Sequence, residues 1–269
     1  SASLVGSEMC IRDRGMGVFG QGFVGKLAFP SANVSDRLEK TFTSVNFNMM
    51  IMVIYALITI AIFGMWYYAR YEGNFLPSPK KTFNPMMLVA IVILVPGTQF
   101  AANFIANLTG YIRPDWLQQY NELFETSGIT DTTFVTVLYS VILAPICEEL
   151  IFRGVTMRCA RKALPFALAN LMQAALFGLF HLNWIQGIYA FALGIVLGYV
   201  CERGGSIYYS MGLHLLFNLW GTLSGFFPDP GNSVVVFVIV IAVTIVSLVV
   251  GFVLFNKGRR KLPINSTGI

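Results

Sequence analysis

The chain has 269 residues and a net charge of +5, and 56% of its residues are apolar whereas only 12% are charged. A soluble globular domain has about 25% charged residues, so this composition excludes a disordered protein, an ordinary nucleic-acid-binding domain and most soluble enzymes. The mean hydropathy of +0.68 indicates a membrane protein instead.

The N-terminal 44 residues precede the first predicted membrane span. Residues 8–13 read EMCIRD and resemble an in-frame translation of a sequencing adapter, so residues 1–15 are expected to be non-native. Residues 16–44 are expected to form a mobile N-terminal segment. Residues 20–25 match the pattern GxGxxG, but no strand precedes them, and a dinucleotide site is therefore not predicted.

Long segments without Asp, Glu, Lys or Arg predict membrane-spanning helices, because a helix needs about 20 residues to cross roughly 30 Å of hydrocarbon. Residues 164–200 are too long for one span and are predicted to divide at 181–187. Pro96 and Gly97 predict a kink in the second span, which is tolerated where neighbours satisfy the freed backbone groups. The seven predicted spans are 47–69, 85–108, 132–149 with a helical extension toward residue 162, the two halves of 164–200, 206–226 and 233–255.

The basic residues lie in short clusters at the ends of these spans. With the C-terminus in the cytoplasm, every strongly basic loop falls on the cytoplasmic side, as the positive-inside rule requires. The acidic segment 113–131 falls on the opposite side and predicts an amphipathic surface helix. We therefore expect a multi-pass protein of a prokaryotic inner membrane, with a transmembrane domain over 45–256 and a basic cytoplasmic tail over 257–269.

The cysteines predict neither a disulfide framework nor a zinc site. They show no CxxC spacing and no metal-ligand pattern, and three of them lie in or beside apolar helices. The four are Cys10, Cys147, Cys159 and Cys201.

Ionisable residues inside a membrane are costly and mark function by default. Glu148, Glu149 and Arg153 stand in the sequence EELIFR at the inner end of the third span. On a helix Glu149 and Arg153 are i, i+4 and can pair, whereas Glu148 points about 100° away and has no obvious partner. The alternative is an ion-paired cluster at the membrane boundary that reaches water.

Both histidines of the chain lie in apolar helices, His181 at the end of FGLFH and His214 at the start of HLLFN. His214 and Asn218 are i, i+4 and share one helical face. Each histidine alone is better explained by a hydrogen bond between helices. Together with the carboxylates of Glu148 and Glu149, the two histidines supply the functional groups that a hydrolase needs. A carboxylate with an imidazole can take a proton from water, and a second imidazole with a carboxamide can donate to an oxyanion.

A polar stripe on the second span consists of Gln99, Asn103 and Asn107, at i, i+4 and i+8. We expect these side chains to hydrogen-bond between helices, and the alternative is that they line the active-site cavity.

The order EExxxR, FxxxH and HxxxN resembles the CAAX protease and bacteriocin-processing family, also called the Abi family, of intramembrane glutamic endopeptidases. All three motifs are complete, and the resemblance spans about residues 132–226. It implies an all-α bundle of about seven transmembrane helices around a conical, water-filled active-site cavity. It also implies a glutamate mechanism without metal or cofactor. In that mechanism Glu148 and His181 activate water, His214 and Asn218 form the oxyanion hole, Glu149 is essential, and Arg153 and Phe177 have supporting roles.

The expected function is hydrolysis of a membrane-associated peptide or protein, such as a bacteriocin leader, with the lipid bilayer as the other partner and no nucleic acid. Three alternatives remain open. The first is removal of a C-terminal tripeptide from a prenylated protein, and the second is a non-catalytic immunity or scaffold role. The third is an ion or proton transporter with Glu148 and His181 as a relay, which predicts inverted repeats that the sequence does not display.

Overall fold

The computed structural model describes residue 36 and residues 45–69, 84–127, 133–224 and 233–258. The expected segments 1–15 and 16–44, apart from Asp36, lie outside the described residues, as do all of the predicted loop 70–81 and all but two residues of the predicted tail 257–269. The chain divides into two compact units, Ser1–Ile54 and Tyr55–Ile269. Everything that positions the site belongs to the second unit.

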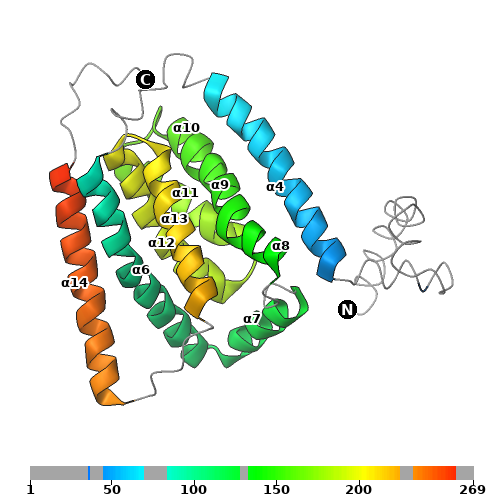
Figure 1. The fold of residues 1–269 in the computed structure, drawn as a ribbon, viewed down its shortest axis with the longest axis vertical. Coiled ribbons are helices and arrows are strands. Elements are labelled where there is room, and N and C mark those ends of the chain that lie inside the picture. The colour runs from blue at the N-terminus through cyan, green and yellow to red at the C-terminus, as the bar shows by residue number, and fades with distance from the viewer. Residues whose placement is uncertain (1–35, 37–44, 70–83, 128–132, 225–232, 259–269) are drawn as a thin grey trace. The chain divides into compact units, whose positions relative to one another are not determined.

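The elements of the described residues are all helical, which confirms the predicted all-α membrane bundle (Figure 1). The glutamates lie on one long helical stretch that contains five successive elements: α8 (Phe134–Val137), η2 (Leu138–Leu143), α9 (Ala144–Glu149), η3 (Leu150–Met157) and α10 (Arg158–Ala160). The other helices are α4 (Val45–Tyr67), α6 (Pro85–Ile112), α7 (Pro114–Ser127), α11 (Phe166–Phe180), α12 (Trp184–Gly204), α13 (Ile207–Ser224) and α14 (Val234–Gly258).

The seven predicted spans correspond to helices of two kinds. Among the described residues, five helical stretches are long and apolar enough to cross a membrane: α4, α6, Phe134–Ala160, α12 and α14. The other two spans are α11, which has only 15 residues, and α13, which has 18 residues and contains His214 and Asn218. These polar residues lower the hydropathy of α13, which therefore gives a weaker membrane-span signal although it contributes two residues to the site.

The ends of the helices follow from local chemistry. Asn84 accepts a hydrogen bond from the N–H of Met86, and Pro85 occupies the first helical position of α6. Asn183 caps α12 in the same way, which confirms the predicted division between α11 and α12. Helix α12 ends before Gly205, whose φ of 65° is the left-handed conformation that glycine adopts without strain.

The main apolar core lies where α6, α12, α13 and α14 meet. Its fully buried members include Leu94, Leu197, Leu213 and Phe255. Helix α14 runs along α6, and α13 contacts both α6 and α9 (Figure 1). Helix α13 therefore connects the core to the helix with the glutamates.

The predicted interruption at Pro96 is satisfied by a side chain from α14. The ring of Pro96 displaces the preceding turn, so the N–H of Gly97 donates to Oγ of Ser247 at 2.9 Å. The Ser247 hydroxyl in turn donates to the carbonyl of Ile93. The hydroxyl is thus inserted into the helical hydrogen-bond ladder, as expected for a proline inside a membrane helix.

Helix α7 forms within the acidic segment, where an amphipathic surface helix was predicted. Trp116 of α7 stacks on Trp184 at the start of α12, with ring centroids 5.3 Å apart. Arg113 and Asp115 form an exposed ion pair of 2.7 Å, and the guanidinium lowers the pKa of the Asp115 carboxyl. The Trp116–Trp184 contact fixes α7 beside α12, next to the turn that contains His181.

Candidate active site

The helix with the glutamates is widened on both sides of them. The π-helical segments η2 and η3 flank α9, and Glu148 and Glu149 are the last two residues of α9. Pro145 accounts for the first widening, because proline has no N–H to donate and its ring clashes with the carbonyl four residues earlier. The sequence predicted a continuous helix here and did not predict these π segments. Such segments occur frequently at functional sites.

Glu149 and Arg153 form a fully buried ion pair. Nη1 of Arg153 lies 2.8 Å from Oε1 of Glu149, and both side chains have 0% exposure. The i, i+4 pairing predicted from the sequence is therefore confirmed. In hydrocarbon a pair of this kind is tolerated only when each charge compensates the other.

Arg153 has two further contacts that hold its guanidinium in place. Nη2 donates to the carbonyl of Gly194 at 3.2 Å, and the guanidinium lies 4.5 Å from the centroid of the Phe177 ring. Nε2 of Gln173 donates to the same Gly194 carbonyl at 2.9 Å and to Oδ1 of Asn170 at 2.7 Å. The sequence reasoning missed Gln173 and Asn170, although they are the polar residues of an otherwise apolar helix and form the same kind of signal as the stripe on α6.

His214 contacts both glutamates. Its Nδ1 lies 3.0 Å from Oε1 of Glu149, and its Nε2 lies 3.6 Å from Oε2 of Glu148. The sequence showed no obvious partner for Glu148, and in the structure its contact is His214, because the two nitrogens of one imidazole point in different directions and reach two different carboxylates. Glu148 retains 16% exposure of its side chain, whereas Glu149 has none.

His181 is the cap residue at the C-terminus of α11. The ring of Phe177 lies between His181 and His214. Its Nδ1 lies 2.8 Å from the carbonyl oxygen of Phe177, so the nitrogen donates and Nε2 of the neutral ring is left as an acceptor. Among the described residues, no carboxylate lies within 4.0 Å of the His181 ring nitrogens. The Phe177 ring is in edge contact with the rings of His181 and His214, at centroid distances of 4.9 and 5.8 Å.

The turn after His181 contains a conformation that is uncommon for its residue type. Leu182 has a φ of 53° and 94% exposure. Non-glycine residues rarely adopt positive φ, and such strain clusters at functional sites.

Asn218 lies one turn beyond His214 on the same face of α13, as predicted. Its Nδ2 donates to the backbone carbonyl of Ser140 in η2 at 2.8 Å. The two polar residues of α13 thus contact the same long helix at two points, Glu149 and Ser140. The three motifs therefore meet around one helix, with Phe177 between the two histidines.

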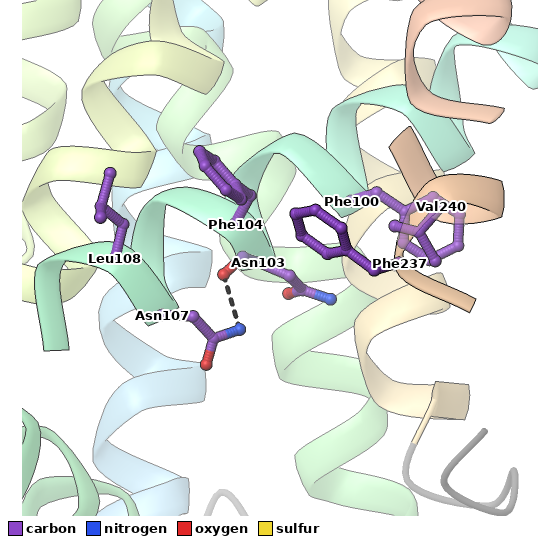
Figure 2. Close-up of a pocket in the computed structure, with 7 residues that line it drawn as sticks. All are labelled: Phe100, Asn103, Phe104, Asn107, Leu108, Phe237 and Val240. Atoms are coloured by element: carbon purple, nitrogen blue, oxygen red, sulfur yellow. Dashed lines mark hydrogen bonds between the residues drawn. The ribbon is translucent and has the colours of Figure 1, made fainter. Parts of the chain in front are cut away.

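The polar stripe on α6 lies elsewhere and is bonded within its own helix. Nδ2 of Asn107 donates to the carbonyl of Asn103 at 2.9 Å, and Nε2 of Gln99 lies 3.5 Å from Oδ1 of Asn103. Among the described residues, these side chains form none of the predicted hydrogen bonds between helices. Figure 2 shows Asn103 and Asn107 at a surface pocket of about 400 Å³ between α6 and α14, which Phe100 and Phe237 also line. The motif residues do not line this pocket.

Within the described part of the chain, no group of three or more His, Cys, Asp or Glu side chains is arranged to hold a metal ion. The free cysteines there are Cys147, Cys159 and Cys201.

Comparison with known protein families finds a match for the segment that contains the three motifs. Residues 130–220 match the family described as Rce1-like, type II CAAX prenyl endopeptidase Rce1-like. The match runs from before Glu148 to beyond Asn218 and confirms the resemblance to the CAAX protease family. No curated protein and no solved structure matches the chain. The matched segment supports a CAAX-type membrane endopeptidase in general.

Proposed function

We propose that this protein, whose residues 130–220 match the Rce1-like family, is an intramembrane endopeptidase that uses glutamate, without a metal ion, to hydrolyse a membrane-associated peptide or protein. The proposed catalytic residues are Glu148, Glu149, His181, His214 and Asn218, with Arg153 and Phe177 in supporting roles. We also propose a prokaryotic inner membrane as its location, with the C-terminus in the cytoplasm.

The observation that carries this proposal is the unequal environment of the two adjacent glutamates. Glu149 is fully buried and compensated by Arg153, and His214 contacts it as well. Glu148 keeps partial exposure, and its ion-pair contact among the described residues is the longer one to His214, at 3.6 Å. Glu148 is therefore the carboxylate that a water molecule can approach, while Glu149 orients the imidazole.

Both ring nitrogens of His214 face carboxylate oxygens. Nδ1 lies 3.0 Å from Oε1 of Glu149, and Nε2 lies 3.6 Å from Oε2 of Glu148. A carboxylate oxygen accepts hydrogen bonds, so in the proposed mechanism both nitrogens of His214 act as donors.

The hydrolytic step follows from these donors and acceptors. A water between Glu148 and His181 attacks the carbonyl carbon, and its proton passes to the Glu148 carboxylate while the carbonyl oxygen becomes an oxyanion. Nε2–H of His214 and the amide of Asn218 donate to that oxyanion. Glu148 then returns the proton to the leaving nitrogen as the C–N bond breaks. Nε2 of His181 is available as the acceptor that orients the water, because Nδ1 is held by Phe177.

The family description favours one second candidate for the substrate. It names a prenyl endopeptidase, so removal of a C-terminal tripeptide from a prenylated cysteine is the narrower alternative to cleavage of another membrane peptide. The two candidates share the catalytic residues and differ in the side chains and lipid of the substrate. A panel of prenylated, unprenylated and leader peptides separates them.

The proposal predicts that Glu148→Gln abolishes cleavage. The amide cannot accept the water proton, so kcat should fall at least about a hundredfold, the usual range for a general base. The measurement is cleavage of the peptide panel by the purified protein in detergent, followed by mass spectrometry.

Glu202→Gln is the matched control for this variant. Glu202 forms a partly exposed ion pair with Arg161, at 3.2 Å, and does not contact the motif residues. The Glu202→Gln variant should cleave the peptides as the wild-type protein does. Equal cleavage by the wild-type protein and the Glu148→Gln variant would refute the catalytic assignment.

A further inference from the structure

The backbone carbonyl of Ser140, before Pro145, accepts a hydrogen bond from a side chain and not from an N–H of its own helix. In η2 the N–H of Ala144 donates to the carbonyl of Tyr139, five residues earlier. The next donor in this register would be residue 145, and its acceptor would be the carbonyl of Ser140. Proline has no N–H, so this carbonyl is open to another donor. Nδ2 of Asn218 supplies it, at 2.8 Å.

We propose that Pro145 is a positioning residue, which leaves the Ser140 carbonyl open so that it orients the amide of Asn218, one helical turn from His214. The inference rests on the proposed function, in which Asn218 donates to the oxyanion. A carboxamide nitrogen has two hydrogens in one plane. If Ser140 holds one of them, the plane of the amide is fixed and the second hydrogen is available to the substrate oxygen.

The same contact also fixes how α13 lies against the glutamate helix. His214 contacts Glu149, and Asn218, one turn later, contacts Ser140, nine positions earlier in the chain. The two contacts run in opposite chain directions, so the helices are antiparallel here and joined at two points. Loss of the second contact would remove the hydrogen bond that holds the Asn218 end of this pair of contacts.

Pro96 offers a natural comparison within the same molecule. It also lies inside a membrane helix, but the backbone groups near it that bond to a side chain are the N–H of Gly97 and the carbonyl of Ile93, and their partner is Ser247 of α14, not a motif residue. Pro96→Ala therefore repeats the chemical change of Pro145→Ala at a place where Asn218 is not involved.

The first test is a double-mutant cycle on thermal unfolding in detergent, which needs no substrate. Asn218→Ala leaves the Ser140 carbonyl unpaired and should lower the unfolding midpoint by a few degrees. In the Pro145→Ala background the backbone has a donor for this carbonyl in either the α or the π register. There Asn218→Ala should lower the midpoint by less than half as much. Equal decreases in the two backgrounds would overturn the inference.

The second test is the effect of Pro145→Ala on catalysis, measured with whichever peptide of the panel the wild-type protein cleaves. A released amide no longer presents its second hydrogen to the oxyanion, so kcat should fall about tenfold or more while KM changes little. Pro96→Ala should leave both constants near the wild-type values. An unchanged kcat in Pro145→Ala would overturn the inference. If the wild-type protein cleaves no peptide, the proposed function fails, and the unfolding cycle still decides whether Pro145 frees the partner of Asn218.

Discussion

At the scale of single residues, the site combines one buried charge pair with one accessible carboxylate. Adjacent residues on a helix point about 100° apart, so Glu148 and Glu149 meet different surroundings although they are neighbours in the chain. Arg153 and the Phe177 ring enclose the side of Glu149, and the side of Glu148 keeps some exposure. The division of roles between the glutamates therefore arises from helical geometry together with the residues that pack on each side.

The buried pair predicts a large loss of stability when one partner is removed. Arg153→Leu leaves the Glu149 carboxylate with 0% exposure and without its cation, so the free energy of unfolding should fall by about 3–5 kcal/mol. The measurement is the unfolding midpoint of the purified protein in detergent.

Arg161→Leu is the matched control for this prediction. The Arg161 and Glu202 side chains are 28% and 31% exposed, and a pair of this kind contributes about 1 kcal/mol or less. Similar losses in the two variants would contradict the view that Arg153 compensates a buried charge.

At the scale of helices, the contact between α11 and α12 depends on a residue without a side chain. A Cβ at Gly198 would lie 1.9 Å from Oδ1 of Asn170 and 2.7 Å from Nε2 of Gln173. The polar groups that support Arg153 through the Gly194 carbonyl therefore occupy the space that a side chain at residue 198 would need. Small residues at such interfaces allow close packing of membrane helices.

Gly198→Ala should destabilise the protein by about 1–3 kcal/mol, because Asn170 must move and the hydrogen bond from Asn170 to the Ile195 carbonyl is strained or lost. Thermal unfolding in detergent measures the change.

Gly212→Ala provides the comparison on α13, since no heavy atom of the described residues outside its chain neighbours and its own helix backbone would lie within 4 Å of its Cβ. That variant should be unchanged or more stable by about 0.5–1 kcal/mol, because glycine is unfavourable inside a helix. Equal effects of the two substitutions would show that the α11–α12 contact does not depend on Gly198.

At the scale of the whole molecule, the helix ends next to the basic loop 70–81 and the basic C-terminal tail lie close to each other. Asn84, which follows residues 70–83 in the chain, donates from Nδ2 to the carbonyl of Gly258 at 2.8 Å, and Gly258 precedes residues 259–269. Arg158 donates to the hydroxyl of Tyr67 at 3.0 Å, close to the end of α4. The described residues that adjoin the loop 70–81 and the C-terminal tail thus lie at one end of the bundle, which supports the prediction of a shared cytoplasmic side.

Cysteine labelling tests this topology. In a background with Cys10 and Cys159 replaced by serine, Ser78→Cys and Ser266→Cys should react with a membrane-impermeant maleimide only after the cells are permeabilised. Gln119→Cys on α7 should react in intact cells, because α7 lies at the opposite end of the bundle. Labelling of residues 78 and 266 from different sides would mean that the number of spans between them is odd.

Several features of this protein were predictable from local sequence. The all-helical membrane fold follows from long uncharged segments. Hydrocarbon offers no hydrogen-bond partners, and a helix pairs all its backbone N–H and C=O groups within the segment. The pairing of Glu149 with Arg153, the break after His181 and the need to satisfy the backbone at Pro96 depend on spacings of a few residues. The family resemblance also needed only the three short motifs, and the match over residues 130–220 confirms it.

The contacts between site residues that are far apart in the chain were decided by tertiary structure. His214 lies 65 residues from Glu149, and Asn218 lies 78 residues from Ser140, so no periodicity within one helix indicates these contacts. The sequence placed Pro145 beside the glutamates but could not show that the carbonyl it frees meets a side chain of α13. Local spacing determines which face of a helix a residue occupies, whereas packing in three dimensions determines what that face meets, and the chemistry proposed for the site depends on the second.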